Sequence, residues 1–142
     1  MKKHWNKQLL ALLLVLLMLV LSVPFAAAEP RSSYSGQCGN NLTWSFDGAG
    51  TLTISGYGEM DDYYRTDAPW ASLRQWIQTV NITAYSATIG AFAFEHCYNL
   101  ETVHLPEYTT PYRLKKIGVD AFYCCTSLKE INLLDSINTI DD

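Results

Sequence analysis

The stretch that decides the fold is written twice along the chain. Residues 89–106 read IGAFAFEHCYNLETVHLP, and residues 117–134 read IGVDAFYCCTSLKEINLL. Both copies follow the spacing I-G-x-x-A-F-x-x-C-x-x-L-x-x-[VI]-x-L, and their first residues lie 117 − 89 = 28 positions apart. The same residue types at a fixed spacing indicate an internal repeat.

Partial copies on both sides set the basic period. Val80 precedes Val103 by 103 − 80 = 23 positions, and Ile140 follows Ile117 by 140 − 117 = 23. The longer spacing between the two full copies therefore contains an insertion of 28 − 23 = 5 residues, within Glu107–Lys116. A period in the twenties predicts a solenoid of stacked coils, because each coil is too small to bury its own apolar face.

Each copy contains one predicted strand with an inward and an outward side. In the first copy Val103 and Leu105 alternate with Thr102 and His104, so that the apolar pair faces the core. Strands of successive repeats stack about 4.8 Å apart, which aligns their outward residues in columns. The candidate binding residues are Thr79, Thr102 and Glu130 in one column and Asn81, His104 and Asn132 in the other. This face either binds a partner or is an ordinary solvated strand face.

The repeat resembles the BspA-like type of leucine-rich repeat, which occurs in surface and secreted proteins of bacteria and some parasitic protists. The resemblance covers roughly residues 80–142, with Leu134 in place of the family's usual proline and Ser86 in place of a valine-like residue. It implies a mostly β fold with short helical turns, built as a leucine-rich-repeat solenoid of about two repeats. It implies partner binding on the strand face and names no ligand.

The first 28 residues are predicted to be a secretory signal peptide. A basic start is followed by thirteen apolar residues, Leu9 to Leu21, and by an A-x-A site before Glu29. A membrane-spanning helix would need about 20 apolar residues, so cleavage and export are favoured, with no membrane span afterwards. Cleavage removes three of the ten Lys and Arg, which leaves a formal charge of 7 − 14 = −7. Such an acidic chain is a poor partner for nucleic acid or an anionic membrane.

A β-hairpin is predicted soon after the signal peptide. Residues 29–35 are polar and are expected to form a linker. Residues 42–46 and 51–55 each alternate apolar and polar types around a Gly-rich turn, which is typical of a hairpin. Its inward side is predicted to carry Leu42, Trp44, Phe46, Leu52 and Ile54.

A short helix is predicted to follow the hairpin. Asp67 is a suitable capping residue and Pro69 a suitable early helix residue, and an apolar stripe follows at helical spacing, formed by Trp70, Leu73 and Ile77. Residues 36–78 together resemble the N-terminal β module that often precedes these repeats. They are expected to cover the open end of the first coil, and the repeats then occupy residues 79–142, open at the C-terminal end.

A cluster of aromatic residues gives a second candidate binding region. Tyr57, Tyr63, Tyr64 and Trp70 lie within fourteen positions of one another. Aromatic side chains suit sugar faces and protein anchors because they give a large contact area at low entropic cost. The alternative, which we favour, is that they pack between the N-terminal module and the first coil.

The four cysteines fit the repeat better than they fit a metal site. Cys97 and Cys125 occupy the same repeat position, where a free thiol behaves as a small buried hydrophobe. An exported protein more often contains disulfides, so a bond between these two neighbouring cysteines is an alternative. The repeat pattern accounts for a cysteine at both positions without such a bond, and we favour free thiols. Cys38 and Cys124 add no C-x-x-C or H-x-x-x-H pair, so no metal site is predicted.

Catalytic motifs are absent from the sequence. It contains no G-x-S-x-G, no Gly-rich phosphate loop and no H-E-x-x-H, and both histidines of the exported chain lie in the repeats. Paired carboxylates for glycoside cleavage could come from Glu59, Asp61 and Asp62, although adjacent acids in a loop are more often merely solvated. No catalytic residue and no cofactor is predicted.

The sequence therefore predicts an exported, non-catalytic leucine-rich repeat protein, secreted or at the bacterial cell surface. Its expected work is recognition of, or adhesion to, an extracellular protein or glycan. Two alternatives stay open: a truncated N-terminal piece of a longer cell-surface adhesin, and a secreted glycan-active enzyme. Because the strand over residues 128–133 would present an unpaired edge, end-to-end association with a second copy is also expected.

Overall fold

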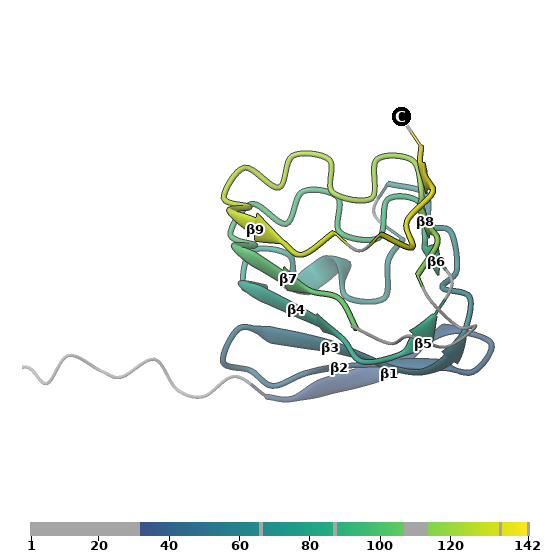
Figure 1. Ribbon diagram of the computed structural model, residues 1–142. Helices are drawn as coiled ribbons and strands as arrows, with labels where there is room; N and C mark the ends of the chain where they lie inside the picture. Colours follow the sequence, from purple (N-terminus) through teal and green to yellow (C-terminus); the bar gives the residue numbers. More distant parts are fainter. Residues whose placement is uncertain (1–31, 66, 87, 107–113, 134, 142) are drawn as a thin grey trace, which may run out of the picture. The chain divides into compact units, whose positions relative to one another are not determined.

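The chain folds around one sheet in which antiparallel strands continue into parallel ones. The computed structural model describes residues 32–65, 67–86, 88–106, 114–133 and 135–141. In this sheet the strands follow the order β1-β2-β3-β4-β7-β9, and β5 pairs with β3 (Figure 1). These strands are β1 (Tyr34–Gly39), β2 (Leu42–Phe46), β3 (Thr51–Gly58), β4 (Thr79–Ile82), β5 (Tyr85–Ser86), β7 (Thr102–His104) and β9 (Glu130–Ile131).

The described residues all belong to one compact unit. The predicted signal peptide and the first part of the predicted linker lie outside the described residues, as does most of the insertion, residues 107–113. Tyr34 and Ser35, which fall inside the predicted linker, already belong to β1. This strand is not predicted from the sequence because S-G-Q-C-G does not alternate apolar and polar residues.

The hairpin prediction is confirmed. β2 pairs antiparallel with β3, with Trp44 opposite Ile54. All five residues predicted to face inward are buried: Leu42, Trp44, Phe46, Leu52 and Ile54. β3 then pairs in parallel with β4, which places Leu52 beside Val80 and Ile54 beside Ile82. The hairpin and the first repeat strand therefore share one hydrophobic core.

The repeat period is visible as strand register. β4, β7 and β9 pair in parallel, with Val80 beside Val103 and Val103 beside Ile131. A second, three-stranded parallel sheet contains β6 (Thr88–Ile89), β8 (Lys116–Ile117) and β10 (Thr139–Ile140) in the order β10-β8-β6. It aligns Ile89, Ile117 and Ile140, the first position of each repeat. A mostly β fold is therefore confirmed, whereas the solenoid, its repeat count and the capping role of the N-terminal module stay predictions.

The predicted helix is only a single turn. The structure has a 3₁₀ helix over Ala71–Leu73, preceded by Trp70 and without a side-chain cap. Asp67 is therefore not the cap that the sequence analysis expected. The predicted apolar stripe is nevertheless buried, since Trp70, Leu73 and Ile77 all belong to the core. A segment this short gains little from helical hydrogen bonds, so packing decides its conformation.

Aromatic rings stack through the core from one segment to the next. Trp70 stacks on Phe94 with ring centroids 5.4 Å apart and an interplanar angle of 18°. Phe94 stacks on Phe122 at 5.4 Å and 14°. Trp70 thus occupies, in the N-terminal module, the place that the Phe of the A-F motif occupies in each repeat. We call these three rings the aromatic column.

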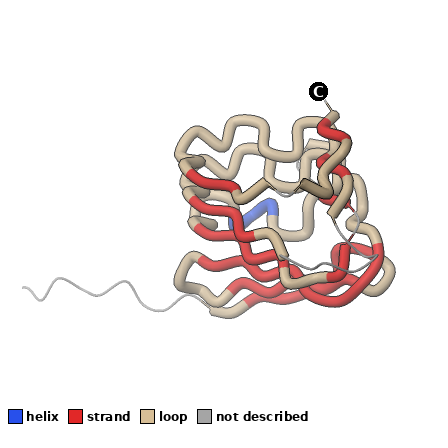
Figure 2. Tube along the Cα trace, viewed as in Figure 1, coloured by secondary structure: helices blue, strands red, loops and turns tan. Residues whose placement is uncertain are grey.

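The segments that return from one strand to the next also stack (Figure 2). We call residues 90–99 the first turn segment and residues 118–127 the second. The main-chain N–H groups of Phe92, Phe94 and His96 donate to the carbonyls of Val119, Ala121 and Tyr123, at 2.9, 2.8 and 2.8 Å. These bonds give the turn segments the same cohesion that ladder hydrogen bonds give the strands.

The glycines of the I-G motif are required by close packing of the main chain. A Cβ atom on Gly90 would lie 1.9 Å from the main-chain oxygen of Asp61, and one on Gly118 would lie 2.6 Å from the main-chain nitrogen of Ala91. Neither neighbour is a flexible side chain that could move aside. Gly90 therefore sets how closely the first turn segment approaches the loop at Asp61, and Gly118 sets how closely the second turn segment approaches the first.

We expect Gly90→Ala to lower the free energy of unfolding by about 3 kcal/mol or more, because the added methyl group forces main-chain atoms apart. Thr126→Ala, at an exposed position of the second turn segment, is the control and should change stability little. Urea unfolding followed by circular dichroism measures both. A Gly90→Ala protein as stable as the control would show that the spacing between these segments is not fixed by the glycine.

Candidate binding surface

The first predicted column lies on the outward side of the sheet. Thr79 is paired with Thr102, and Thr102 with Glu130. Thr79 and Thr102 are half-buried and Glu130 is exposed, while their neighbours Val80 and Val103 are buried. The structure therefore brings these three side chains together in the order that the repeat period predicted.

The second predicted column is interrupted at its last member. Asn81 is paired with His104, as expected. Asn132, however, lies after the end of β9, and its side chain accepts a hydrogen bond from the N–H of Leu105 (2.9 Å) and donates one to the carbonyl of Leu105 (3.3 Å). Its amide thus replaces a missing strand hydrogen bond, so Asn132 acts in the structure as a tie between neighbouring strands.

The same face continues onto β3, which the sequence analysis did not include. Thr53 is the register partner of Asn81, and Thr51 is the partner of Thr79. At the next position the hydroxyls of Ser55 and Thr83 lie 3.1 Å apart, and Thr83 also donates to the carbonyl of Ile54. The outward position of Thr51, Thr53 and Ser55 could have been predicted from the alternation of apolar and polar residues in the hairpin. Where the apolar residues are buried, the polar residues between them must face outward. We call the surface formed by Thr51, Thr53, Ser55, Thr79, Asn81, Thr102, His104 and Glu130 the outer strand face.

The outer strand face is mostly neutral. Seven of its eight residues are Thr, Ser, Asn or His, and the carboxylate of Glu130 lies at its β9 end. Within the described ranges, the side chains of Thr79, Asn81, Thr102, His104 and Glu130 form no hydrogen bond or ion pair with other residues. Their hydroxyl, amide and imidazole groups are therefore available to a ligand.

The tyrosine cluster separates into two groups. Tyr63 is tied to the core, because its hydroxyl donates to the carbonyl of Cys38 at 3.1 Å and its ring packs edge-on against Trp70. Burial raises the pKa of the Tyr63 hydroxyl, and the nearby Cys38, Asp61 and Asp62 raise it further. Packing, rather than binding, explains this member of the cluster.

The other two tyrosines are open to solvent. Tyr57 is 62% exposed and Tyr64 is 69% exposed. Tyr57 is the register partner of Tyr85, another exposed tyrosine, next to the Ser55–Thr83 contact. Tyr64 lies elsewhere and packs against Phe92, with ring centroids 6.2 Å apart. The two tyrosines therefore belong to different places, and only Tyr57 adjoins the outer strand face along β3.

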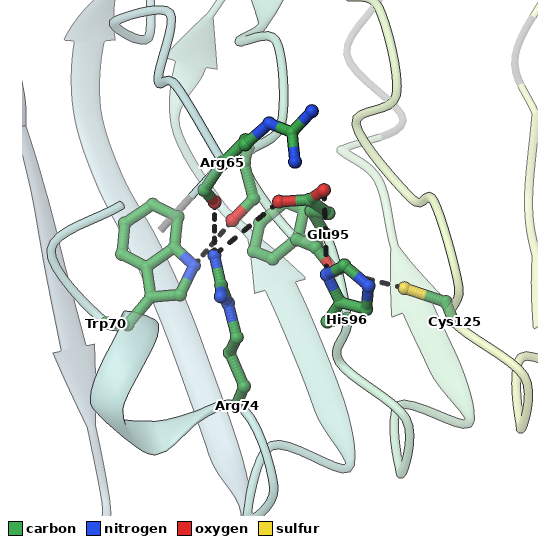
Figure 3. Close-up of polar contacts among 8 residues, drawn as sticks. Arg65, Trp70, Arg74, Glu95, His96 and Cys125 are labelled. Atoms are coloured by element: carbon green, nitrogen blue, oxygen red, sulfur yellow. Dashed lines mark hydrogen bonds and ion pairs between the residues drawn. The ribbon is translucent and has the colours of Figure 1, made fainter. Parts of the chain in front are cut away.

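A buried ion pair joins the 3₁₀ turn to the first turn segment (Figure 3). Glu95 has a side-chain exposure of only 8%, and its carboxylate lies 3.9 Å from the Arg74 guanidinium and 3.5 Å from the Nδ1 atom of His96. Arg74 also donates to the carbonyl of Arg65, and the indole N–H of Trp70 donates to the carbonyl of Ala93 at 2.7 Å. Sequence reasoning missed this network because its members come from two distant segments with no shared motif.

All four cysteines carry free thiols. Cys38 and Cys97 are fully buried, and Cys125 is half-buried and donates to the carbonyl of Phe94 at 3.1 Å. Burial, with a smaller contribution from Asp61, raises the pKa of Cys38 to about 12. Burial also raises the pKa of Cys97, and it raises that of Cys125 to about 11. Cys38, Cys97 and Cys125 are therefore protonated at neutral pH and behave as packing groups.

Two of the three candidate acids of the loop, Asp61 and Asp62, form hydrogen bonds with neighbouring segments. The Asp62 carboxylate accepts a hydrogen bond from the N–H of Ala91 at 2.7 Å, and the N–H of Asp61 donates to the carbonyl of Cys38. This loop therefore anchors the first turn segment. Within the part of the chain that the structure describes, no group of three His, Cys, Asp or Glu residues could hold a metal ion, and no helix is long and apolar enough to cross a membrane.

The region that contains the paired repeat strands also matches a family of known repeats. Residues 74–142 match the family described as BspA type leucine-rich repeat region (6 copies). This part of the chain is similar to the BspA type of leucine-rich repeat. No curated protein matches the sequence.

Two solved structures are similar to this chain. The first is a leucine-rich repeat protein from Eubacterium ventriosum, with 26% identity and a TM-score of 0.67 over 78% of the chain. The second is a leucine-rich cell surface protein from Faecalibacterium prausnitzii, with 22% identity and a TM-score of 0.45 over 80% of the chain. The chain spans only 28% of the length of the first protein and 34% of the second.

We expect Arg74→Met to lower the free energy of unfolding by about 3 kcal/mol, because it leaves the Glu95 carboxylate buried without a counter-charge. Lys129→Met removes the exposed ion pair with Glu101, whose charged atoms lie 2.9 Å apart, and is the matched control. It should cost less than about 1 kcal/mol. Equal losses in the two variants, measured by urea unfolding, would contradict a structural role for the buried pair.

We expect Cys97→Ser to cost about 1–3 kcal/mol of stability, because the smaller, more polar hydroxyl enters an apolar site. Cys124→Ser, at a half-buried position, should cost less. A thiol reagent applied at pH 8 should label Cys97 only after denaturation, which mass spectrometry detects. Rapid labelling of Cys97 in the native protein, or a mass lower by two hydrogens, would contradict the buried free thiol.

Proposed function

We propose that this protein is exported and recognises an extracellular partner with its outer strand face, without catalysing a reaction. The observation that carries the proposal is the register of β3, β4 and β7. It aligns Thr53 with Asn81 and His104, and Thr79 with Thr102, on one side of a sheet whose other side is buried. A face that supplies side chains with unused donors and acceptors is suited to binding.

The chemistry of the face favours a neutral polar ligand. Its hydroxyl and amide groups donate and accept hydrogen bonds, which suits the hydroxyls of a glycan or the main chain of an extended peptide. Glu130 adds negative charge at one end, so an anionic ligand would be repelled there. Among extracellular ligands we therefore propose a neutral glycan or a peptide segment.

The cell-surface assignment rests on three supports. Residues 1–28 have the composition of a signal peptide, the repeat region is of the BspA type, and a related leucine-rich repeat protein comes from a bacterium. BspA-type repeats are typical of bacterial surface proteins. A non-catalytic role is favoured over a glycan-active enzyme because the Asp62 carboxylate is used to hold the first turn segment.

We expect the double variant Asn81→Arg/Thr102→Arg to weaken binding at least tenfold without lowering the melting temperature by more than a few degrees. The bulky cations cover the outer strand face, while the main-chain ladder stays intact. Binding to immobilised neutral glycans and to extracellular matrix proteins is measured by surface plasmon resonance. The control is Thr126→Arg, which adds the same side chain at an exposed position of the second turn segment.

Two single variants separate the face from the tyrosines. Tyr57→Ala adjoins the outer strand face and should weaken binding modestly, whereas Tyr64→Ala should leave it unchanged. Full binding by the double arginine variant, together with loss of binding in Tyr64→Ala, would place the site on the loop beside Phe92 and refute the proposal.

A further inference from the structure

Two exposed tyrosines lie side by side at one end of the outer strand face. Tyr57, near the end of β3, is the register partner of Tyr85 on β5 (Figure 1). Thr83 and Tyr85 are exposed and Ala84, between them, is buried, so Tyr85 lies on the same outward side as Thr83. Parallel strands lie about 4.8 Å apart, so the two aromatic side chains start from neighbouring points of the sheet. We call Tyr57 and Tyr85 the tyrosine pair.

The main chain around Tyr57 is fixed but leaves the ring uncovered. Gly56 and Gly58, on either side of it, have φ angles of 106° and 113°, a conformation that favours glycine. A Cβ atom on Gly56 would clash with the main-chain oxygen of Asn41, and the N–H of Tyr57 donates to that same oxygen at 3.1 Å. The chain is therefore held against the start of β2, and the two neighbours of Tyr57 have no side chain that could cover its ring.

A row of hydroxyl groups lies next to the tyrosine pair. Thr43 on β2 is the register partner of Ser55 on β3, and the Ser55 hydroxyl lies 3.1 Å from that of Thr83. Ser55 and Thr83 each precede one of the tyrosines by two positions, so the two rows are about 6.6 Å apart along the strands. We call Thr43, Ser55 and Thr83 the hydroxyl row. Large aromatic side chains therefore stand next to short ones that donate and accept hydrogen bonds.

We propose that the tyrosine pair and the hydroxyl row bind a neutral glycan of β-linked pyranose units whose hydroxyls are equatorial. In such a sugar the hydroxyls lie around the edge of the ring, and C–H groups occupy both of its faces. The weakly positive C–H groups pack on the negative faces of aromatic rings, and the edge hydroxyls exchange hydrogen bonds with the hydroxyl row. This inference rests on the proposed function and narrows it to one class of ligand and one end of the face.

The charge of this region favours a neutral sugar over an acidic one. The tyrosine pair and the hydroxyl row contain no Asp, Glu, Lys, Arg or His. Glu59 follows Tyr57 by two positions and is exposed. Its carboxylate would repel a glycan that carries uronate or sulfate groups, and no cation of these two rows would offset that repulsion.

An extended peptide fits the region less well than a glycan does. Strand-like peptides bind chiefly by main-chain hydrogen bonds to an open sheet edge. β3 pairs with β2 on one side and with β4 and β5 on the other, so it presents no open edge. A ligand on this side of β3 contacts side chains only. That suits a sugar, whose hydroxyls need no main-chain partner.

The test uses the protein and cellohexaose, a neutral chain of β-linked glucose units. In an NMR titration, millimolar cellohexaose should shift the amide signals of Tyr57 and Tyr85. Saturation of the protein's aromatic protons should transfer to the C–H groups of the sugar rings. The matched control ligand is the hexamer of β-linked glucuronic acid, which differs by one carboxylate on each unit and should bind at least tenfold more weakly.

Matched variants locate the site. Tyr57→Ala/Tyr85→Ala should weaken cellohexaose binding at least tenfold, because both aromatic faces are lost. Tyr57→Phe keeps the ring and should bind within about twofold of the unmodified protein. Tyr98→Ala removes a tyrosine of similar exposure, 49% against 45% for Tyr85, from the first turn segment and should leave binding unchanged. The melting temperatures should differ by no more than a few degrees, because all three side chains are exposed.

Three results would overturn the proposal: no binding of millimolar cellohexaose, equal binding of the glucuronic acid hexamer, or undiminished binding by Tyr57→Ala/Tyr85→Ala. A fourth would overturn it while the proposed function stands. In that case an extracellular matrix protein would bind the double alanine variant normally and would fail to bind Asn81→Arg/Thr102→Arg. The outer strand face would then recognise a partner without the tyrosine pair.

Discussion

The aromatic column of Trp70, Phe94 and Phe122 is the interaction on which the rest of the structure depends. Each ring contacts the next at 5.4 Å, so the N-terminal module and the two turn segments share one continuous stack. Phe94 also donates its main-chain N–H to Ala121, and Trp70 its indole N–H to Ala93. Ring stacking and hydrogen bonding are therefore carried by the same residues, and a shift of one ring would disturb both. Small residues at 93 and 121 allow the main chains to approach closely enough for this.

Much of the fold could be predicted from two periodicities. A period of two within each strand identified the buried side chains. The repeat spacing, which is 23 residues or 28 where the insertion lies, identified which repeat strands lie side by side. Both periodicities are patterns of residue types along the chain, so they can be recognised in a single sequence. The features that were missed depend on contacts between distant segments. β1 has no alternation and is held by pairing with β2. The turn after Asp67 is too short to form a stable helix by itself, so the burial of Trp70 decides its shape.

The candidate site was predictable only in part, for the same reason. The repeat period placed Thr79, Thr102 and Glu130 correctly, because they lie within the ladder. It misjudged Asn132, which follows a strand of only two residues and turns its amide to the main chain of Leu105. Tyr63 and Tyr64 are neighbours in sequence, yet one is held against Trp70 and the other is exposed. Two tyrosines that are neighbours in the sequence look equivalent there. Only their tertiary contacts show that one is packed and the other is exposed.

The contacts that join neighbouring segments and the side chains of the outer strand face lie on different surfaces of the protein. Main-chain hydrogen bonds and ring stacking join each turn segment to the next one. The outward side chains of β4 and β7 take no part in these contacts. Substitutions on the outer strand face can therefore change ligand contacts without weakening the contacts that join one repeat to the next. A protein built this way can vary the proposed recognition surface while its glycines, its A-F pairs and the aromatic column stay fixed, because these determine how closely the segments pack.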